Sequence, residues 1–273
     1  YTSHIMAISL TRRFARGVSF GLNDNIVLQT KGSTGARLEH NADGTFHERA
    51  DQKQADELLG NSVGTRHRFK GNFVWDIPGL KNSGTMVKLL SNDWRLSGIW
   101  SANTGGGYDV GTSFQDGTGS QNLTGSPNFG ARTRIIGNVG GGCDTSNQYN
   151  QFNTAAFAPP QTGSVGLDSG VDYLHGCFYQ QLDLALERSI RLGENRRVSI
   201  RLDAFNAPNQ FHITGRSTTM TVKSLTDPTI VNSQFNPDGS LNQSRLTPRQ
   251  AGFGAVNGWQ GARSLQLWVR FTF

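Results

Sequence analysis

The sequence of 273 residues has no run of about twenty consecutive apolar residues, so it contains no segment that could cross a bilayer as a helix. Proline is scarce, with 8 residues, and periodicities typical of helices are few. The mean hydropathy of -0.45 does not exclude a protein that crosses a membrane with strands, since only alternate residues of such strands need be apolar. Glycine is abundant, with 34 residues, and it fills the gaps between alternating segments together with Ser, Asn and Thr. This distribution favours an all-β protein with large loops.

The sequence also lacks the short motifs that carry common catalytic chemistry. It contains no nucleophile elbow, no phosphate-binding loop, no HExxH and no CxxC. The glycine triplets at residues 105–107 and 140–142 are not followed by the Lys-Ser/Thr pair that a phosphate-binding loop needs. We therefore expect no catalytic residue, no cofactor and no metal site, and we do not expect an enzyme.

Acidic residues are fewer than basic ones, which gives a net charge of +6. Such a charge could indicate nucleic-acid binding, but no basic stripe carries interleaved aromatic residues. The tightest arginine groups lie at predicted turns instead, at Arg12, Arg13, Arg16, Arg191, Arg196 and Arg197. We interpret them as cations that face solvent or lipid headgroups, and we expect no nucleic-acid partner.

Cysteine is nearly absent, because Cys143 and Cys177 are the only two in the sequence. Both fall in one long predicted loop. In an oxidising compartment two cysteines most simply form one disulfide that closes a surface loop. A zinc site would need more ligands, and only His175 is close in the sequence. The sequence alone leaves the pairing of the two cysteines open.

The last nine residues give the clearest indication of structure in the sequence. They alternate strictly, and one set is apolar: Leu265, Leu267, Val269, Phe271 and Phe273. A period of two indicates a β-strand, and about nine to eleven residues cross a bilayer at a tilt. An outer-membrane barrel ends this way, since its outer face meets lipid and its last strand closes the ring. The alternative for this segment alone is a buried edge strand of a β-sandwich.

Six further segments alternate in the same way, at residues 4–14, 18–29, 67–77, 94–102, 181–190 and 197–205. Short turns join them in pairs, whereas long loops at about residues 31–65, 103–179 and 207–263 separate the pairs. Short periplasmic turns at one end and long extracellular loops at the other are typical of outer-membrane barrels. A sandwich has no reason to sort its loops by length. The sequence therefore predicts an antiparallel transmembrane β-barrel segment with seven or eight strands.

An odd number of strands needs an explanation, because bacterial single-chain barrels usually have an even number. Seven strands in an open sheet would leave unpaired backbone groups in lipid. We expect residues 1–273 to be the C-terminal part of a larger barrel, and the start at Tyr1 without a signal peptide fits maturation or a missing N-terminal part. The alternative is an eighth strand hidden at residues 163–173 or 220–234.

The charged residues expected on the inner side of the strands have both signs. They are Arg68, Lys70, Asp76, Asp183, Glu187, Arg201, Asp203 and Arg270. A polar barrel interior allows such residues to pair with each other or with a plug. The alternative is that they line part of a solute path.

Five motifs resemble one family in the right order along nearly the whole chain. Residues 65–78 (TRHRFKGNFVWDIP) resemble its "RHRF…YDLP" strand, and residues 94–100 (WRLSGIW) resemble its "WQLSGIY" strand. Residues 152–157, 201–209 and 3–18 resemble its "FNPAAF", "RAEFFNLFNHPN" and "ALQVKLTRRFSRGL" elements. The family is that of the Oar-like TonB-dependent outer-membrane receptors, which carry a carboxypeptidase-regulatory-like domain and are abundant in Acidobacteria and myxobacteria.

The resemblance implies the C-terminal barrel portion of such a receptor, in the outer membrane of a Gram-negative bacterium. Its strands would form a wall against outer-membrane lipid, and its loops would contact a large solute that is taken up or passed through. The barrel-assembly machinery would read the C-terminal strand, and the TonB system would act only through an upstream plug. The alternatives are a structural or adhesive outer-membrane barrel without transport, and a soluble β-sandwich binding module. The ligand stays open, because the loop around Cys143 and Cys177 departs from the family pattern.

Overall fold

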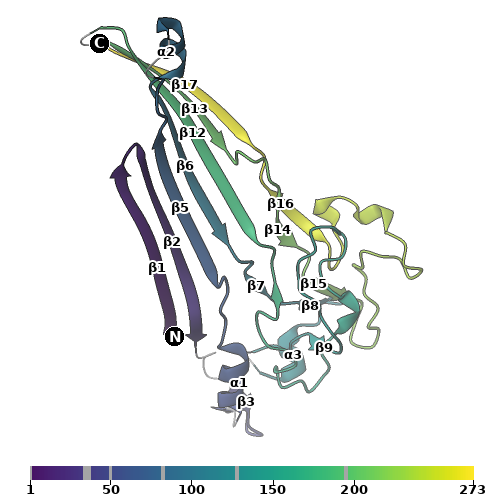
Figure 1. The fold of residues 1–273 in the computed structure, drawn as a ribbon. Helices are drawn as coiled ribbons and strands as arrows, with labels where there is room; N and C mark the ends of the chain where they lie inside the picture. Colours follow the sequence, from purple (N-terminus) through teal and green to yellow (C-terminus); the bar gives the residue numbers. More distant parts are fainter. Residues whose placement is uncertain (1, 33–37, 49–50, 81–83, 127–128, 194–195) are drawn as a thin grey trace.

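The computed structural model describes residues 2–32, 38–48, 51–80, 84–126, 129–193 and 196–273, and its main element is one antiparallel sheet (Figure 1). The sheet has seven strands in the order β1-β2-β5-β6-β12-β13-β17. Their bounds are β1 Thr2–Ala15, β2 Val18–Lys31, β5 His67–Asp76, β6 Trp94–Asn103, β12 Tyr179–Arg191, β13 Arg197–Phe205 and β17 Ser264–Thr272. Each long strand pairs with the preceding long strand of the chain, so the sheet is a meander. The seven predicted strands are confirmed.

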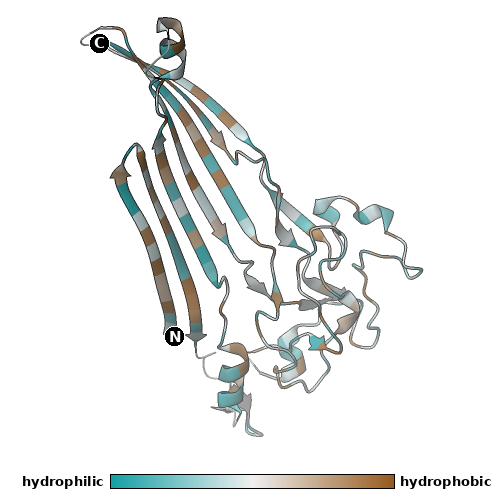
Figure 2. Ribbon diagram, viewed as in Figure 1, coloured by the Kyte–Doolittle hydropathy of each residue, from teal (hydrophilic) through white to brown (hydrophobic). Residues whose placement is uncertain are grey.

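One side of the sheet, the apolar face, presents a continuous set of apolar side chains. The register places Leu267 of β17 opposite Leu202 of β13, Leu202 opposite Leu186 of β12, and Leu186 opposite Leu96 of β6. Because cross-strand partners point to the same side, these leucines form a row. Leu267 is 66% exposed, and no described element covers the row. Brown bands alternate with teal along these strands in Figure 2.

The opposite side, the polar face, carries the alternate residues of the same strands. Gln266 lies opposite Asp203, Asp203 opposite Ala185, and Ala185 opposite Ser97. The alternation predicted from the sequence therefore separates apolar from polar side chains over four strands.

The strands are joined at one end, the turn end, by connections of unequal length. β1 and β2 are joined by Arg16 and Gly17 alone, with φ angles of 52° and 81°. Positive φ at both central residues is typical of a hairpin turn that matches the twist of the strands. The predicted short turn between β5 and β6 is wrong. Pro78 and Gly79 end the strand region, but the chain then forms a helix, α2 (Thr85–Ser91), before β6 begins.

The three long connections lie at the other end, the loop end, and contain small elements of their own (Figure 1). The first holds β3 (Leu38–His40), β4 (Phe46–Glu48) and α1 (Gln52–Leu59). The second holds β7 (Gly107–Tyr108), β8 (Gly111–Phe114), α3 (Ser120–Thr124), β9 (Arg134–Ile135), η1 (Thr154–Ala156), β10 (Phe157–Ala158) and β11 (Leu174–His175). The third holds β14 (His212–Arg216), β15 (Thr219–Val222), η2 (Gln243–Arg245), η3 (Pro248–Gln250) and β16 (Val256–Gln260). The helix α1 lies where the sequence predicted only loop.

The largest buried apolar cluster lies in these loops and not in the sheet. Phe152 is 5.7 Å from Phe157 and 5.4 Å from Phe253 between ring centroids, and Leu174 and Met220 are fully buried beside them. The second and third loops are also joined directly, because β15 pairs with β8 in parallel. The loops thus form one packed unit at the loop end, which the sequence did not predict.

Within the described residues the sheet is not closed, and β1 and β17 lie at its two edges. Neither residues 163–173 nor residues 220–234 add a strand to the seven-stranded sheet in the described chain. The short strand β15 pairs with β8 of the second loop, outside the seven-stranded sheet. Among the described helices, none has the length and apolar character that a membrane span requires.

Candidate functional site

Several charged residues on the polar face are held in ion pairs. Arg95 Nε of β6 lies 2.6 Å from Asp76 Oδ1 of β5. Arg201 Nε of β13 lies 2.9 Å from Oδ1 of Asp203, and its Nη1 lies 4.0 Å from Glu187 Oε2 of β12. These pairs agree with the interpretation that inward charges neutralise each other.

A chain of hydrogen bonds continues along the polar face toward the loop end. Tyr179 Oη donates to Gln181 Oε1 at 2.7 Å, and Gln181 Nε2 donates to Asp183 Oδ1 at 2.9 Å. The backbone N–H of Asn206 also donates to Asp183, at 2.8 Å. This carboxylate is therefore satisfied within the sheet, and Tyr179 is fixed at the point where β12 meets the loops.

A cavity of about 490 Å³ lies where the polar face meets the packed loops. Its walls come from the end of β6, the start of β12, β14 and the turns beside them. The lining side chains include Asn103, Tyr108, Tyr179, Thr214, Arg216 and Thr218. Glycine backbone at residues 105, 106, 176 and 215 forms much of the remaining wall. A cavity of this size, with few polar groups on a rigid sheet, is of the kind that binds small molecules.

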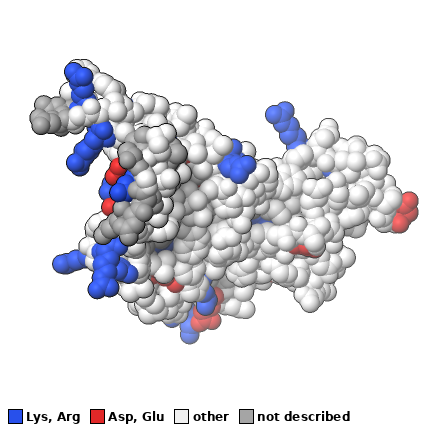
Figure 3. All heavy atoms as spheres, turned by 45° about the horizontal axis from the view of Figure 1, so that its top comes forward, with Lys and Arg blue, Asp and Glu red and all other residues white. Residues whose placement is uncertain are grey.

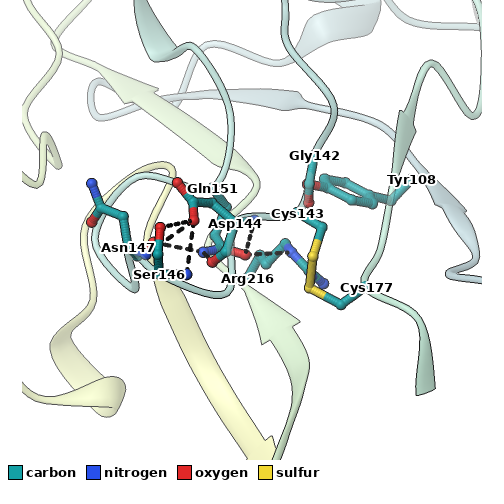
Figure 4. The surroundings of a disulfide bond; sticks show 9 residues. All are labelled: Tyr108, Gly142, Cys143, Asp144, Ser146, Asn147, Gln151, Cys177 and Arg216. Carbon is teal, nitrogen blue, oxygen red and sulfur yellow. Dashed lines mark hydrogen bonds between the residues drawn. A yellow bond between two sulfur atoms is a disulfide. The ribbon is translucent and has the colours of Figure 1, made fainter. Parts of the chain in front are cut away.

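Arg216 is the only cation in the wall of this cavity, and none of its contacts in the described chain is with a carboxylate. Its Nε donates to Gln151 Oε1 at 3.3 Å, and its Nη2 lies 3.0 Å from the sulfur of Cys177. The guanidinium carbon is 5.4 Å from the centroid of the Tyr108 ring. Figure 4 shows the guanidinium between Gln151 and the disulfide.

Burial acts on both Arg216 and Tyr108. It lowers the pKa of the Arg216 guanidinium, against a smaller opposing effect of the Tyr108 phenol. It raises the pKa of Tyr108 to about 12, although the charge of Arg216 acts in the opposite direction. Tyr108 Oη also donates to the backbone oxygen of Gly142 at 2.5 Å. The cavity therefore combines a neutral phenol with a partly desolvated cation.

A disulfide covalently links two segments of the second loop at this site. Cys143 and Cys177 are joined in a disulfide, with 5.1 Å between their Cα atoms. The bond closes a loop of sequence separation 34 and holds residue 177 against Arg216 (Figure 4). The pairing that the sequence left open is thus present, and it lies directly at the cavity.

Two further cations lie beside the cavity on the polar face. Arg68 of β5 is the register partner of Asn103, which lines the cavity, and Lys70 is the partner of Ser101 on the same face. Both cations are exposed, and within the described chain neither has an ion-pair partner. These two cations lie directly next to the cavity, whereas the ion pairs Asp76–Arg95 and Arg201–Asp203 lie farther along the polar face.

A larger cavity, of about 710 Å³, lies at the turn end. Its wall includes the Asp76–Arg95 ion pair together with Lys88, Glu187 and Arg191. The predicted turn arginines Arg12, Arg13, Arg16, Arg191, Arg196 and Arg197 are all exposed. Cations gather at the turn end where it comes forward in Figure 3. We interpret this cavity as an opening lined by charged surface groups, since its strongest ionic contact, Asp76–Arg95, joins two residues of its own wall.

The predicted apolar residues of the C-terminal strand do not reach either cavity. Leu265, Leu267, Val269 and Phe271 of β17 and the following Phe273 are all exposed on the apolar face. Arg216 and Tyr108, in contrast, were not predicted as functional residues. Each is an isolated residue in a glycine-rich loop, so no spacing in the sequence distinguishes it. Among the described residues, no three His, Cys, Asp or Glu side chains are placed to hold a metal ion.

Comparison with protein families matches residues 3–266 to the family described as "Outer membrane beta barrel domain". The comparisons with curated proteins and with solved structures found no match. The matched range includes the seven-stranded sheet almost completely and all three long loops. It also includes every residue in the wall of the loop-end cavity.

Proposed function

Because the chain belongs to the outer membrane beta barrel domain family, we propose that it forms wall and loops of a TonB-dependent receptor in the outer membrane, for uptake or passage of a large solute. The apolar face meets outer-membrane lipid, and the polar face lines the barrel interior. The loop end is extracellular and the turn end is periplasmic. The proposal assigns the chain no catalytic reaction.

The observation that carries the proposal is the packed unit formed by the loops at the loop end. A barrel that served only as a wall or anchor would have no need for a buried loop core with its own disulfide. Here Phe152, Phe253 and Met220 are buried in the loops, and the same loops enclose a cavity that meets the polar face. Loops on a rigid scaffold are a common place for ligand binding. The five sequence motifs shared with Oar-like receptors support the same proposal.

The proposed partners follow from this arrangement. The barrel-assembly machinery would recognise the strand that ends in Phe271 and Phe273, whose side chains are exposed on the apolar face. The two open sheet edges, β1 and β17, would be completed by strands of the same receptor, because unpaired backbone groups in lipid are costly. TonB would act through a plug upstream of these residues.

The test is to purify the native polypeptide from outer membranes and to measure its intact mass, N-terminal sequence and binding to the periplasmic domain of TonB. We expect a mass far above 29.7 kDa, a plug sequence before the barrel and binding to TonB. A native protein that does not bind TonB would refute the transport proposal and favour a structural or adhesive barrel.

A further inference from the structure

We propose that the loop-end cavity binds an oxyanion, either a carboxylate or a phosphate, that belongs to the transported solute. This inference rests on the proposed function, because it names the substrate class of the same receptor. Arg216 in the cavity wall would bind the oxyanion directly. Arg68 and Lys70 would attract it along the polar face.

The contacts of Arg216 leave most of its hydrogen-bonding capacity unused. A guanidinium has five N–H donors, and the contacts of Arg216 within the described chain use one on Nε and one on Nη2. One acceptor is an amide oxygen of Gln151 and the other is a sulfur of Cys177, which is a weak acceptor. A half-buried cation without a carboxylate partner is unfavourable, and two oxygens of a carboxylate or a phosphate could accept hydrogen bonds from two of its remaining N–H groups at once.

The carboxylates around the cavity are already engaged by other groups. Asp109, next to Tyr108 in the chain, lies 2.8 Å from Arg132 Nη2. Asp183, on the strand that contributes Tyr179, accepts hydrogen bonds from Gln181 and a backbone N–H. These acids therefore leave the positive charge of Arg216 uncompensated. An anion from outside the described chain would supply the missing partner.

The two cations beside the cavity give a second argument. Arg68 and Lys70 lie on the loop half of the polar face, where neither has an ion-pair partner in the described chain. Charges of one sign in a cleft with low-dielectric walls raise the local concentration of oppositely charged solutes. A solute that enters from the loop end would meet these cations next to the cavity, because Arg68 is the partner of Asn103.

The remaining wall of the cavity suits the neutral part of a polar solute. Asn103, Thr214 and Thr218 supply amide and hydroxyl groups, and Tyr179 supplies a ring and a hydroxyl. The volume of about 490 Å³ lies within the range of small-molecule sites. The site would thus hold one or two sugar-sized units and their charged group.

The experiment measures binding by the native full-length protein, purified from outer membranes in detergent, with titration calorimetry. The probes are digalacturonate, glucose 6-phosphate and the neutral disaccharide galactobiose, which matches digalacturonate in size. We expect at least one charged probe to bind at least tenfold more tightly than galactobiose. The carboxylate and phosphate probes then show which source of the oxyanion the site prefers. Equal affinities for all three probes would refute the inference.

Variants locate the site. Arg216→Gln should weaken binding of the charged probe by about ten- to a hundredfold, as expected when a hydrogen bond to a charged group is lost. Arg68→Gln, an exposed substitution on the sheet, should weaken it by a smaller factor and make it less dependent on salt. Arg249→Gln, an exposed loop cation outside the cavity, should leave it unchanged and serves as the matched control.

Two outcomes separate this inference from the proposed function. Unchanged affinity in both Arg216→Gln and Arg68→Gln, with the disulfide still formed in each, would refute the oxyanion site and leave the receptor proposal intact. Strong, Arg216-dependent binding by a protein that does not bind TonB would refute transport but keep the site. Arg216→Lys keeps the charge and loses the planar fork, so it should restore only part of the affinity.

Discussion

Asp24 and His67 form a hydrogen-bonded pair on the apolar face of the sheet, with 3.0 Å between Oδ2 of Asp24 and Nδ1 of His67. The two residues come from neighbouring strands, since Ile26 of β2 is the register partner of His67. The second oxygen of Asp24 is buried and has no hydrogen-bond partner in the described chain. Asp24 interrupts the apolar pattern of its strand, and the His67 side chain compensates for this by a hydrogen bond to the carboxylate.

This pair predicts an asymmetric response to mutation. His67→Phe alone should lower the free energy of unfolding by about 1–3 kcal/mol, because it leaves a carboxylate without its donor on the lipid side. Asp24→Leu together with His67→Phe should recover most of that loss, since both polar groups are then removed. Denaturant unfolding of the barrel in detergent measures both values. A double variant no more stable than His67→Phe would contradict this account.

The two faces of β17 predict a second contrast between neighbouring residues. Val269→Arg places a charge on the apolar face and should cost roughly 2–4 kcal/mol at mid-bilayer depth. Leu184→Arg on β12 should behave alike. Gln266→Arg, on the polar face of the same strand, is the matched control and should cost far less. Unfolding measured in lipid vesicles tests the assignment, and equal tolerance at residues 266 and 269 would show that the faces are wrongly assigned.

The strands could be predicted from the sequence because one side of each must be apolar over its whole length. That requirement sets a period of two, which is visible in Leu182, Leu184 and Leu186 without any knowledge of their neighbours. The lengths of the connections then predicted which strands follow one another in the sheet and which end of the sheet carries the short turns or the long loops. The family match agrees with this reading at the level of an outer membrane β-barrel.

The loops could not be predicted because their core depends on contacts between distant segments. Phe152, Leu174 and Phe253 pack together although about a hundred residues separate the first from the last, and no local period marks them. For the same reason Arg216 could not be predicted as a functional residue, because its role depends on Gln151 and Cys177 from another loop. The helix α2 is short, and the preceding Pro78 and Gly79 suggested only a turn.

The disulfide predicts a local effect on the loops. The entropy of closing a loop of sequence separation 34 corresponds to about 4 kcal/mol. We expect Cys143→Ser/Cys177→Ser to loosen the loop unit and to leave the strands intact, because no strand of the sheet contains either cysteine. Limited proteolysis should cut the variant within residues 104–178 faster than the wild type. A loss of the folded barrel itself, seen as loss of heat-modifiable mobility on gels, would show that the bond stabilises the sheet as well.

The buried phenol of Tyr108 predicts how the loop unit responds to alkaline pH. Burial raises the pKa of Tyr108 from 10.0 to about 12, so between these values the folded protein keeps a proton that the unfolded chain has lost. The contribution of the buried Tyr108 phenol to the free energy of unfolding is therefore complete below pH 10 and is lost as the pH rises toward 12. An ultraviolet titration of tyrosinate should show one group with a midpoint near 12 that is absent in Tyr108→Phe. Since the charge of Arg216 lowers this pKa, Arg216→Gln should move the midpoint higher still. A midpoint near 10 would contradict the burial of the Tyr108 phenol, and a downward shift in Arg216→Gln would contradict the contact between the guanidinium and the ring.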